Sequence, residues 1–331
     1  MKEADIRPRQ LFDTYLRLLE EDTRTFFGDH RTFEIVPCPG CGKPEGREAF
    51  TKSGFVYVEC PGCATLWASP RPAAARLDDF YRTSPSVQYW HTAFYRETAE
   101  ARREHMFRPR AVALGELLDA RGIPSGGTFA DIGAGYGIFL DEIRRLERFR
   151  DVIGIEPNPG MAAVCRERGF HVVEKSLEAV IASDVTPDIV TAFEVLEHVW
   201  DPLRFLTSAV RMLAPRGWLV LTTLTVSGFD IQMLWERSTA VSPPQHLNLL
   251  SVEGMRLLVE RAGFEIVELS TPGRLDVDIV ANALERDPGL PLPRFVKTLL
   301  TSGDTTVRDR FQEFLRASRL SSHVRVVARK P

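Results

Sequence analysis

The chain has no long uncharged apolar segment. None of its 331 residues belongs to a run of the roughly 18 apolar residues that a membrane-spanning helix needs, and Met1–Arg7 lacks the apolar core of a signal peptide. Basic residues are not in excess, because the formal net charge is −3 at pH 7, which gives no overall attraction to nucleic acid. These absences predict a cytoplasmic globular protein without a membrane span.

Cysteine is scarce, and four of the five cysteines form two CPGC motifs. These four are Cys38, Cys41, Cys60 and Cys63. Two such pairs, separated by eighteen residues, are typical of structural zinc sites with four thiolate ligands. Two disulfides are the alternative, which a reducing cytoplasm disfavours. We therefore predict a zinc ribbon with a structural Zn²⁺, and we expect the isolated Cys165 to be a small buried apolar side chain.

Zinc ribbons can bind nucleic acid, so the charge of the surrounding segment matters. Residues 1–110 carry 17 Lys and Arg against 16 Asp and Glu, with no basic run. Recognition of a phosphate backbone needs a basic patch or stripe. Nucleic acid is therefore a disfavoured partner for this ribbon.

Three glycines at alternate positions follow a short apolar segment. Gly133, Gly135 and Gly137 allow the backbone to turn sharply and to come close to a ligand. The dinucleotide fingerprint GxGxxG requires its last glycine at position 138, which is Ile. The pattern thus predicts a nucleotide-type ligand and disfavours the binding of a pyrophosphate.

Short apolar segments alternate with amphipathic ones from position 128 onward. The predicted strands span 128–132, 151–156, 171–174, 188–193, 217–224, 264–269 and 323–328. Such alternation is typical of βαβ units around a buried parallel sheet. The second strand ends at Glu156, where a carboxylate can bind the hydroxyls of a ribose. We therefore expect an α/β, Rossmann-like fold.

Four parts are expected along the chain. They are an N-terminal helix (1–30), the zinc ribbon (31–70), a helical linker or lid (71–122) and the α/β domain (123–331). Within the last part, residues 272–321 form an insertion with apolar residues at helical spacing. We expect this insertion to lie as helices over the sheet edge or to form a homodimer interface.

The α/β domain resembles the class I S-adenosylmethionine (SAM) dependent methyltransferases. Five segments carry the resemblance, in the order in which the family has them: Asp131–Gly137, the strand ending at Glu156, 188–199, 213–220 and 261–265. The resemblance implies a seven-stranded methyltransferase sheet with SAM on the glycine loop. The cofactor-binding residues that it implies are Asp131, Gly133, Gly135, Gly137, Glu156, Pro157, Ser176, Leu177, Phe193 and Glu194. In the family pattern, Asp131 holds the amino end of SAM and Glu156 binds the ribose.

The segment after the ribbon resembles that of bacterial methyltransferases that carry such a ribbon. The NPRP turn of these enzymes is SPRP here, with Ser69 in place of Asn. They commonly modify glycans or secondary metabolites, which implies a small-molecule or glycan acceptor. An aromatic cluster follows, made of Tyr81, Tyr89, Trp90, His91, Phe94 and Tyr95. It is expected to form either a substrate lid over the cofactor or packing between the parts of the chain.

Methyl transfer from a sulfonium to a hydroxyl needs alignment of the two groups and a base. His246 is the favoured base, because it lies in a PPxHLN segment that the family shares, with Gln245 in place of the usual acidic residue. The alternative for His246 is a capping or orienting role at a helix over 252–262. His198 is the second candidate catalytic residue.

Glu194, Glu197 and His198 form an E-x-x-E-H motif. It resembles the metal-binding motif of ubiquinone-pathway O-methyltransferases and small-RNA 2′-O-methyltransferases, where a divalent ion activates the acceptor hydroxyl. Metal-free relatives share the motif, so both roles stay open. The predicted activity is SAM-dependent methyl transfer, with O-methylation favoured. Sugar C-methylation, metal-assisted O-methylation, RNA or protein methylation through the ribbon, and SAM binding without catalysis are the alternatives.

Overall fold

The structure, a computed structural model, describes residues 8–331. Met1–Arg7, on which the signal-peptide expectation rests, lie outside the described residues. Helix α2 (Arg9–Phe27) begins the described part, and Phe27 is buried against Phe55 of the ribbon. Among the helices of residues 8–331, none has the length and apolar character needed to cross a membrane.

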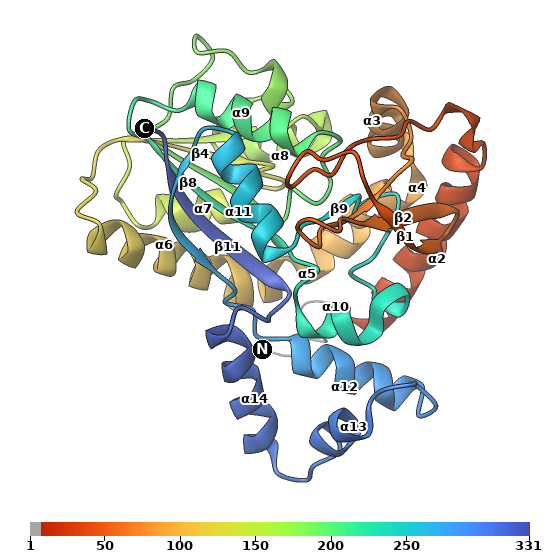
Figure 1. The fold of residues 1–331 in the computed structure, drawn as a ribbon. Coiled ribbons are helices and arrows are strands. Elements are labelled where there is room, and N and C mark those ends of the chain that lie inside the picture. Colours follow the sequence, from red (N-terminus) through yellow and green to blue (C-terminus); the bar gives the residue numbers. More distant parts are fainter. Residues whose placement is uncertain (1–7) are drawn as a thin grey trace.

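A small sheet carries the cysteine motifs. It consists of the hairpin β1 (Arg47–Lys52) and β2 (Phe55–Glu59), then β3 (Leu66–Ala68) and β9 (Asn248–Leu249), in that order. Strand β9 comes from the C-terminal half of the chain and pairs antiparallel with β3. In Figure 1, β9 accordingly lies near β1 and β2, with β3 between β2 and β9 in the sheet, although β9 comes from a much later part of the chain. The ribbon is thus joined to the rest of the molecule by backbone hydrogen bonds.

A seven-stranded sheet forms the centre of the molecule, in the order β10-β11-β8-β7-β4-β5-β6 (Figure 1). Its strands are β4 (Thr128–Ile132), β5 (Asp151–Ile155), β6 (His171–Val173), β7 (Ile189–Phe193), β8 (Trp218–Leu224), β10 (Glu265–Ser270) and β11 (His323–Arg329). Strands β4 to β8 are parallel, whereas β11 is antiparallel to both of its neighbours. This order confirms the predicted Rossmann-like α/β fold with seven strands.

Helices cover both faces of the sheet. Successive residues of β4 point to opposite faces, so that Phe129 and Ala130 belong to different buried clusters. On the Ala130 side lie α9 (Pro202–Met212) and α11 (Val252–Arg261), and on the Phe129 side lie α6 (Arg108–Ala120), α7 (Ile138–Arg144) and α8 (Pro159–Glu167). The loops after the parallel strands therefore meet at one edge, which is where such sheets bind ligands.

A run of helices links the ribbon to the sheet. It comprises α3 (Ala74–Thr83), α4 (Pro85–Tyr89), α5 (Tyr95–Arg102) and α6, with π-turns at Trp90–Phe94 and Arg103–Phe107. Pro109 lies in the first turn of α6, where its missing N–H has no intrahelical partner to lose. Turns of the π type often occur at functional sites, and the first of these contains Trp90 and His91 of the predicted aromatic cluster.

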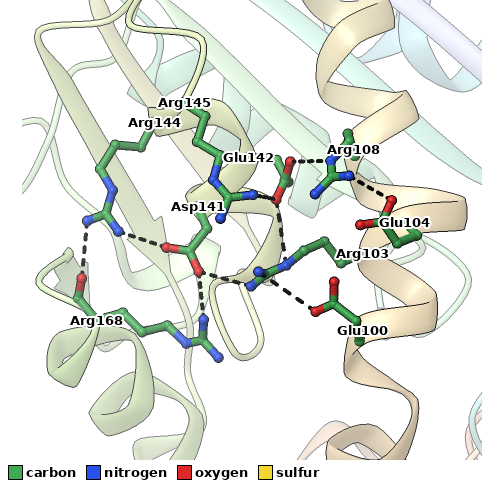
Figure 2. A network of polar contacts seen from close by, with 9 residues as sticks. All are labelled: Glu100, Arg103, Glu104, Arg108, Asp141, Glu142, Arg144, Arg145 and Arg168. Carbon is green, nitrogen blue, oxygen red and sulfur yellow. Dashed lines mark hydrogen bonds and ion pairs between the residues drawn. The ribbon is translucent and has the colours of Figure 1, made fainter.

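Figure 2 shows the charged residues that fasten this helical run to α7. Arg103 lies 3.6 Å from both Asp141 and Glu142, and Arg108 lies 3.3 Å from Glu142. Both carboxylates are buried, and several guanidinium groups offset the cost of removing them from water. The linker is thereby held on the helix that follows the glycine loop.

The insertion between β10 and β11 forms the predicted helices. They are α12 (Asp276–Arg286), α13 (Arg294–Leu300) and α14 (Thr305–Ala317), which share an apolar core of their own. Figure 1 places them in blue at the lower end of the molecule, next to α10 (Phe229–Leu234). Phe295 and Phe314 of this insertion stay 72% and 54% exposed. The homodimer interface stays a prediction.

Candidate active site

One cavity of about 960 Å³ lies at the carboxyl edge of the parallel strands. Nine of the ten predicted cofactor residues line it, and so do both candidate catalytic histidines. The tenth, Gly137, lies behind the cavity at the start of α7, with φ at +71° and little room for a side chain beside Cys165. It positions the loop and does not face the cavity.

Gly133 has the least room for a side chain of the three loop glycines. Its φ is +73°, and a Cβ atom there would lie 2.8 Å from the side chain of Val195. Its N–H donates to the carbonyl of Ile155 at 2.8 Å, which joins the loop to the end of β5. Only glycine satisfies both the conformation and the space at this position.

Glu156 stands at the end of β5, as predicted. Its two carboxylate oxygens accept hydrogen bonds from the backbone N–H groups of Gly135 and Asn158, each at 2.9 Å. Burial raises the pKa of Glu156 to about 7, although both hydrogen bonds lower it. The carboxylate therefore ties the glycine loop to the next loop, and each oxygen keeps a second lone pair for a ligand hydroxyl.

Asp131 lies deeper in the same region. It accepts a hydrogen bond of 2.6 Å from the hydroxyl of Thr191, and burial raises its pKa to about 7. Pro157, Ser176 and Leu177 line the cavity on the side of Glu156. Asp131 and Glu156 therefore present two carboxylates to the same cavity.

Glu194 is the centre of a polar cluster that the sequence did not reveal. Its Oε1 accepts from Arg110 at 2.9 Å, from the Thr222 hydroxyl at 2.9 Å and from His323 Nε2 at 2.7 Å. Burial opposes its ionisation, yet His323 and Arg110 hold the pKa of Glu194 well below its usual value. Arg110 also lies over the ring of Phe193, with 5.2 Å between the guanidinium carbon and the ring centroid.

His246 and His198 face each other across the cavity wall, with ring centroids 4.8 Å apart. His246 Nδ1 lies 2.7 Å from the carbonyl of Ala240. A carbonyl oxygen only accepts, so Nδ1 carries a proton and the acceptor lone pair of the neutral ring is on Nε2. Ser251 caps α11, because its hydroxyl accepts from the N–H of Gly254 at 2.8 Å. The capping role considered for His246 is therefore wrong.

Glu197 is buried and His198 is half-buried beside His246. The hydroxyl of Tyr81 lies 3.1 Å from His198 Nδ1, and burial together with His246 lowers the pKa of His198 to about 3. Burial and the charge of Glu194 raise the pKa of Glu197 to about 8. Ligand atoms of Glu197, His198 and His246 all lie within 4.8 Å of one another. In this group of possible metal ligands, His246 thus takes the position that the E-x-x-E-H motif suggested for Glu194.

Some residues of the aromatic cluster line the cavity, as a substrate lid would, and others pack inside the protein. Tyr81, Trp90, His91 and Tyr95 line the cavity, whereas Phe94 is fully buried and Tyr89 packs on the N-terminal core. Tyr136 of the glycine loop stacks on Tyr95 at 4.7 Å and donates its hydroxyl to the carbonyl of His91. The segment 90–95 therefore covers the glycine loop directly.

Helix α2 contributes to the same wall, which no motif indicated. Phe12 and Tyr15 line the cavity. The ring of Tyr15 lies 4.6 Å from that of Trp90, and its hydroxyl donates to the side chain of Gln245. The only signal in the sequence was the helical spacing of these apolar residues.

The four motif cysteines lie together, and all five cysteines are free thiols. The Cys38–Cys63 and Cys41–Cys60 sulfur atoms are 3.5 Å apart, far beyond the roughly 2.05 Å of a disulfide. Both motifs make the same turn, with positive φ at Gly42 and Ala64. Four sulfurs in such a group fit a tetrahedral Zn²⁺. Cys165 is fully buried, as expected.

A family model described as a methyltransferase domain matches residues 89–269, which is more than half of the chain and excludes the ribbon. One relative, from Mycolicibacterium smegmatis, is named "Probable S-adenosylmethionine-dependent methyltransferase"; it is 30% identical over 141 residues, which are 41% of this chain and 51% of that protein. A ubiquinone biosynthesis O-methyltransferase from Methylococcus capsulatus is 29% identical over 119 residues, which are 34% of this chain and 49% of that protein. The chain spans about half the length of the curated relatives it matches.

Parts of the chain are also similar to solved structures. A possible histamine N-methyltransferase from Thermotoga maritima has a TM-score of 0.43 and 21% identity, covering 73% of this chain and 100% of that chain. A cyclopropane synthase from Mycobacterium tuberculosis has a TM-score of 0.42 and 18% identity, covering 66% of this chain and 84% of that chain.

Proposed function

The chain belongs to the family of methyltransferase domains, and from this premise we propose that it transfers the methyl group of SAM to a small-molecule or glycan acceptor. One observation carries the proposal: the glycine loop, Glu156 and the two facing histidines line the same cavity of about 960 Å³. That volume is near the upper end of the range of about 300–1,000 Å³ for small-molecule sites. It supports the binding of an acceptor beside the cofactor.

The residues around the cavity fit SAM in both shape and charge. Glu156 would accept hydrogen bonds from the ribose hydroxyls, and Ser176 and Leu177 would border the adenine. Asp131 would bind the amino group of the methionine part of SAM. Arg110 would offset the charge of the carboxylate of that methionine part. When bound, SAM supplies a methyl group on a sulfonium, and the protein has to align the acceptor with it.

His246 is the base in this proposal. Its Nε2 would take the proton of the acceptor hydroxyl, while Nδ1–H remains bonded to the carbonyl of Ala240. This bond fixes the plane of the ring and stabilises the imidazolium that forms. His198 does not compete for the proton, because its lowered pKa keeps it neutral.

A divalent metal ion is the second candidate, and a specific observation favours it. Ligand atoms of Glu197, His198 and His246 lie within 4.8 Å of one another, and imidazole with carboxylate is a usual donor set for transition metals. Two relatives, from Methylococcus capsulatus and Azorhizobium caulinodans, are named ubiquinone biosynthesis O-methyltransferases. A metal here would lower the pKa of the acceptor hydroxyl. O-methylation is therefore favoured, and C-methylation of a sugar stays an alternative.

The ribbon is proposed to hold one structural Zn²⁺ on Cys38, Cys41, Cys60 and Cys63. Closed four-thiolate sites leave no open position for a substrate. The ion would therefore stabilise the ribbon and take no part in methyl transfer. Methylation of RNA or protein through the ribbon is disfavoured by the balanced charge of residues 1–110.

A screen with isotope-labelled SAM tests the proposal. Metabolite extracts are incubated with the protein, and labelled products are identified by mass spectrometry. The wild type and the control His171→Ala, which changes an exposed histidine of β6, should give the same product, whereas His246→Ala should give almost none. Fragmentation of the product distinguishes O- from C-methylation. Failure to bind S-adenosylhomocysteine (SAH) would refute the proposal, and SAH binding without any product would support a binding module.

A further inference from the structure

The loop that carries His246 makes several of its hydrogen bonds to the ribbon. We call residues 238–249 the histidine loop. At its start, Lys52 Nζ of β1 donates to the carbonyl of Ser238 at 2.7 Å. At its end, β3 pairs with β9, and the N–H of Ala68 donates to the carbonyl of Leu247 at 2.9 Å. Both ends of the loop are therefore bonded to strands of the small sheet.

Tyr57 fixes the histidine itself. This residue of β2 is fully buried, and its hydroxyl donates to the backbone carbonyl of His246 at 2.7 Å. Burial raises the pKa of Tyr57 above its usual range, so the hydroxyl stays a donor. Phe50 stacks on the ring of Tyr57 at 5.3 Å and meets Trp235 edge-on at 5.4 Å. The position of Tyr57 is thus set by the ribbon hairpin and by the chain that enters the histidine loop.

Arg71 holds the next two residues of the loop. It is 1% exposed, and its guanidinium donates to the side-chain oxygen of Asn248 at 3.1 Å and to the carbonyl of Trp200 at 2.8 Å. The amide of Asn248 in turn donates to the carbonyl of Val199 at 2.7 Å. The ribbon end, the histidine loop and the segment after β7 are therefore one hydrogen-bonded unit.

The same unit sets the distance between the two histidines. The N–H of Leu247 donates to the carbonyl of Glu197 at 2.9 Å. His246 and His198 each directly adjoin one of these two residues, and their rings meet at 4.8 Å. In contrast, the glycine loop and Glu156 make their hydrogen bonds to β5, β6, α8 and the carbonyl of His91, none of which belongs to the ribbon. A change in the ribbon should thus reach the histidines and leave the cofactor end unaffected.

We propose that the ribbon is the scaffold that positions His246 for the transfer step, and that Tyr57 is the positioning residue that makes the connection. The role of His246 as base rests on the function proposed above, whereas the coupling of the loop to the ribbon does not. A displacement of a reacting group by about 1 Å can cost on the order of 100-fold in rate. The loss of one buried hydrogen bond at the carbonyl of His246 is therefore expected to lower kcat and to spare SAM binding.

The test uses the full chain with its zinc and compares Tyr57→Phe with Ser69→Ala. Ser69→Ala is a matched control, because the Ser69 hydroxyl contacts only Val36 inside the ribbon among the described residues. Hydrogen exchange of residues 238–250 is followed by mass spectrometry, and SAH binding is measured by calorimetry. Tyr57→Phe should speed exchange in this segment by roughly 5- to 10-fold, which corresponds to the net free energy of one hydrogen bond. Residues 128–160 and the affinity for SAH should stay unchanged.

Ser69→Ala should leave exchange of the histidine loop at the wild-type rate. Equal exchange in the two variants, or a loss of SAH affinity in Tyr57→Phe alone, would overturn the proposal. If Tyr57→Phe does not fold, Lys52→Met removes the contact at the other end of the loop and should give the same local change. Once an acceptor is known, Tyr57→Phe should lower kcat about 10-fold with little change in KM for SAM. Faster exchange without any methyl transfer would support the scaffold role of the ribbon and would refute the proposed catalytic function.

Discussion

Replacing Glu156 by alanine should weaken the binding of SAH by roughly 1.5–3 kcal/mol, or about 10- to 150-fold in Kd, because charge-assisted hydrogen bonds to the ribose are lost. Glu156 is 4% exposed and accepts from the N–H groups of Gly135 and Asn158. Part of the loss in binding free energy would therefore come from disorder of the glycine loop, which the Glu156 carboxylate holds through Gly135. Glu156→Gln keeps one acceptor oxygen for that loop and separates the two contributions. Calorimetry with SAH measures both variants.

The pH dependence of this binding provides a second, sharper readout. The pKa of Glu156 is raised by burial from 4.5 to about 7, so the folded free protein takes up a proton as the pH falls through 7. The contribution of Glu156 to the free energy of unfolding of the free protein should therefore rise as the pH falls from about 7 to 4.5. The affinity for SAH should decrease over the same range, because a protonated carboxyl has fewer acceptor positions for the ribose.

Asp131 has a similarly raised pKa, so the control has to isolate Glu156. Glu156→Gln should lose the part of the pH dependence that belongs to residue 156 and keep the part that belongs to Asp131. An unchanged Kd in Glu156→Ala would refute the ribose assignment. An identical pH profile in Glu156→Gln and the wild type would refute the argument from burial.

Three further outcomes are expected. His246→Ala should reduce kcat by about 10²- to 10⁴-fold without affecting SAH binding, and wild-type activity should rise with pH as an imidazole loses its proton; full activity of the variant would leave alignment as the only mechanism. If the metal alternative holds, a chelator that spares the ribbon should abolish turnover, Mg²⁺ should restore it, and Glu197→Gln should be as damaging as His198→Ala. Elemental analysis should find one zinc per chain, and Cys41→Ser should make the ribbon sensitive to protease before the sheet unfolds; folded zinc-free protein would contradict this.

The central parallel strands were predictable because they are short, largely apolar segments that are buried on both faces of the sheet. All five residues of β4 are buried, and helices with a single apolar face cover the sheet. The glycine loop and Glu156 were predictable for a related reason. Their positions at consecutive strand ends are fixed by the topology, so spacing along the chain translates directly into proximity in space.

The environment of Glu194 could not be predicted in this way. The E-x-x-E-H spacing alone suggests that three ligands share one side of the chain. Glu194 has a φ of +56°, so the backbone turns at this residue, and its carboxylate points to Arg110 and His323. These partners come from α6 and β11, at separations of 84 and 129 residues. No local pattern encodes a contact at such distances.

Strand β9 explains why a division of the chain at residue 123 separates segments that fold together. It has only two residues, too few for any alternation to mark it as a strand. Yet β3 would be an open edge without it, and an open edge is a place where other chains can pair. By closing that edge, the residues next to His246 complete the ribbon's sheet, while Tyr57 of the ribbon and Arg71 directly after it donate hydrogen bonds to the histidine loop. Each segment satisfies backbone groups of the other, so the zinc site and the proposed base should gain or lose order together.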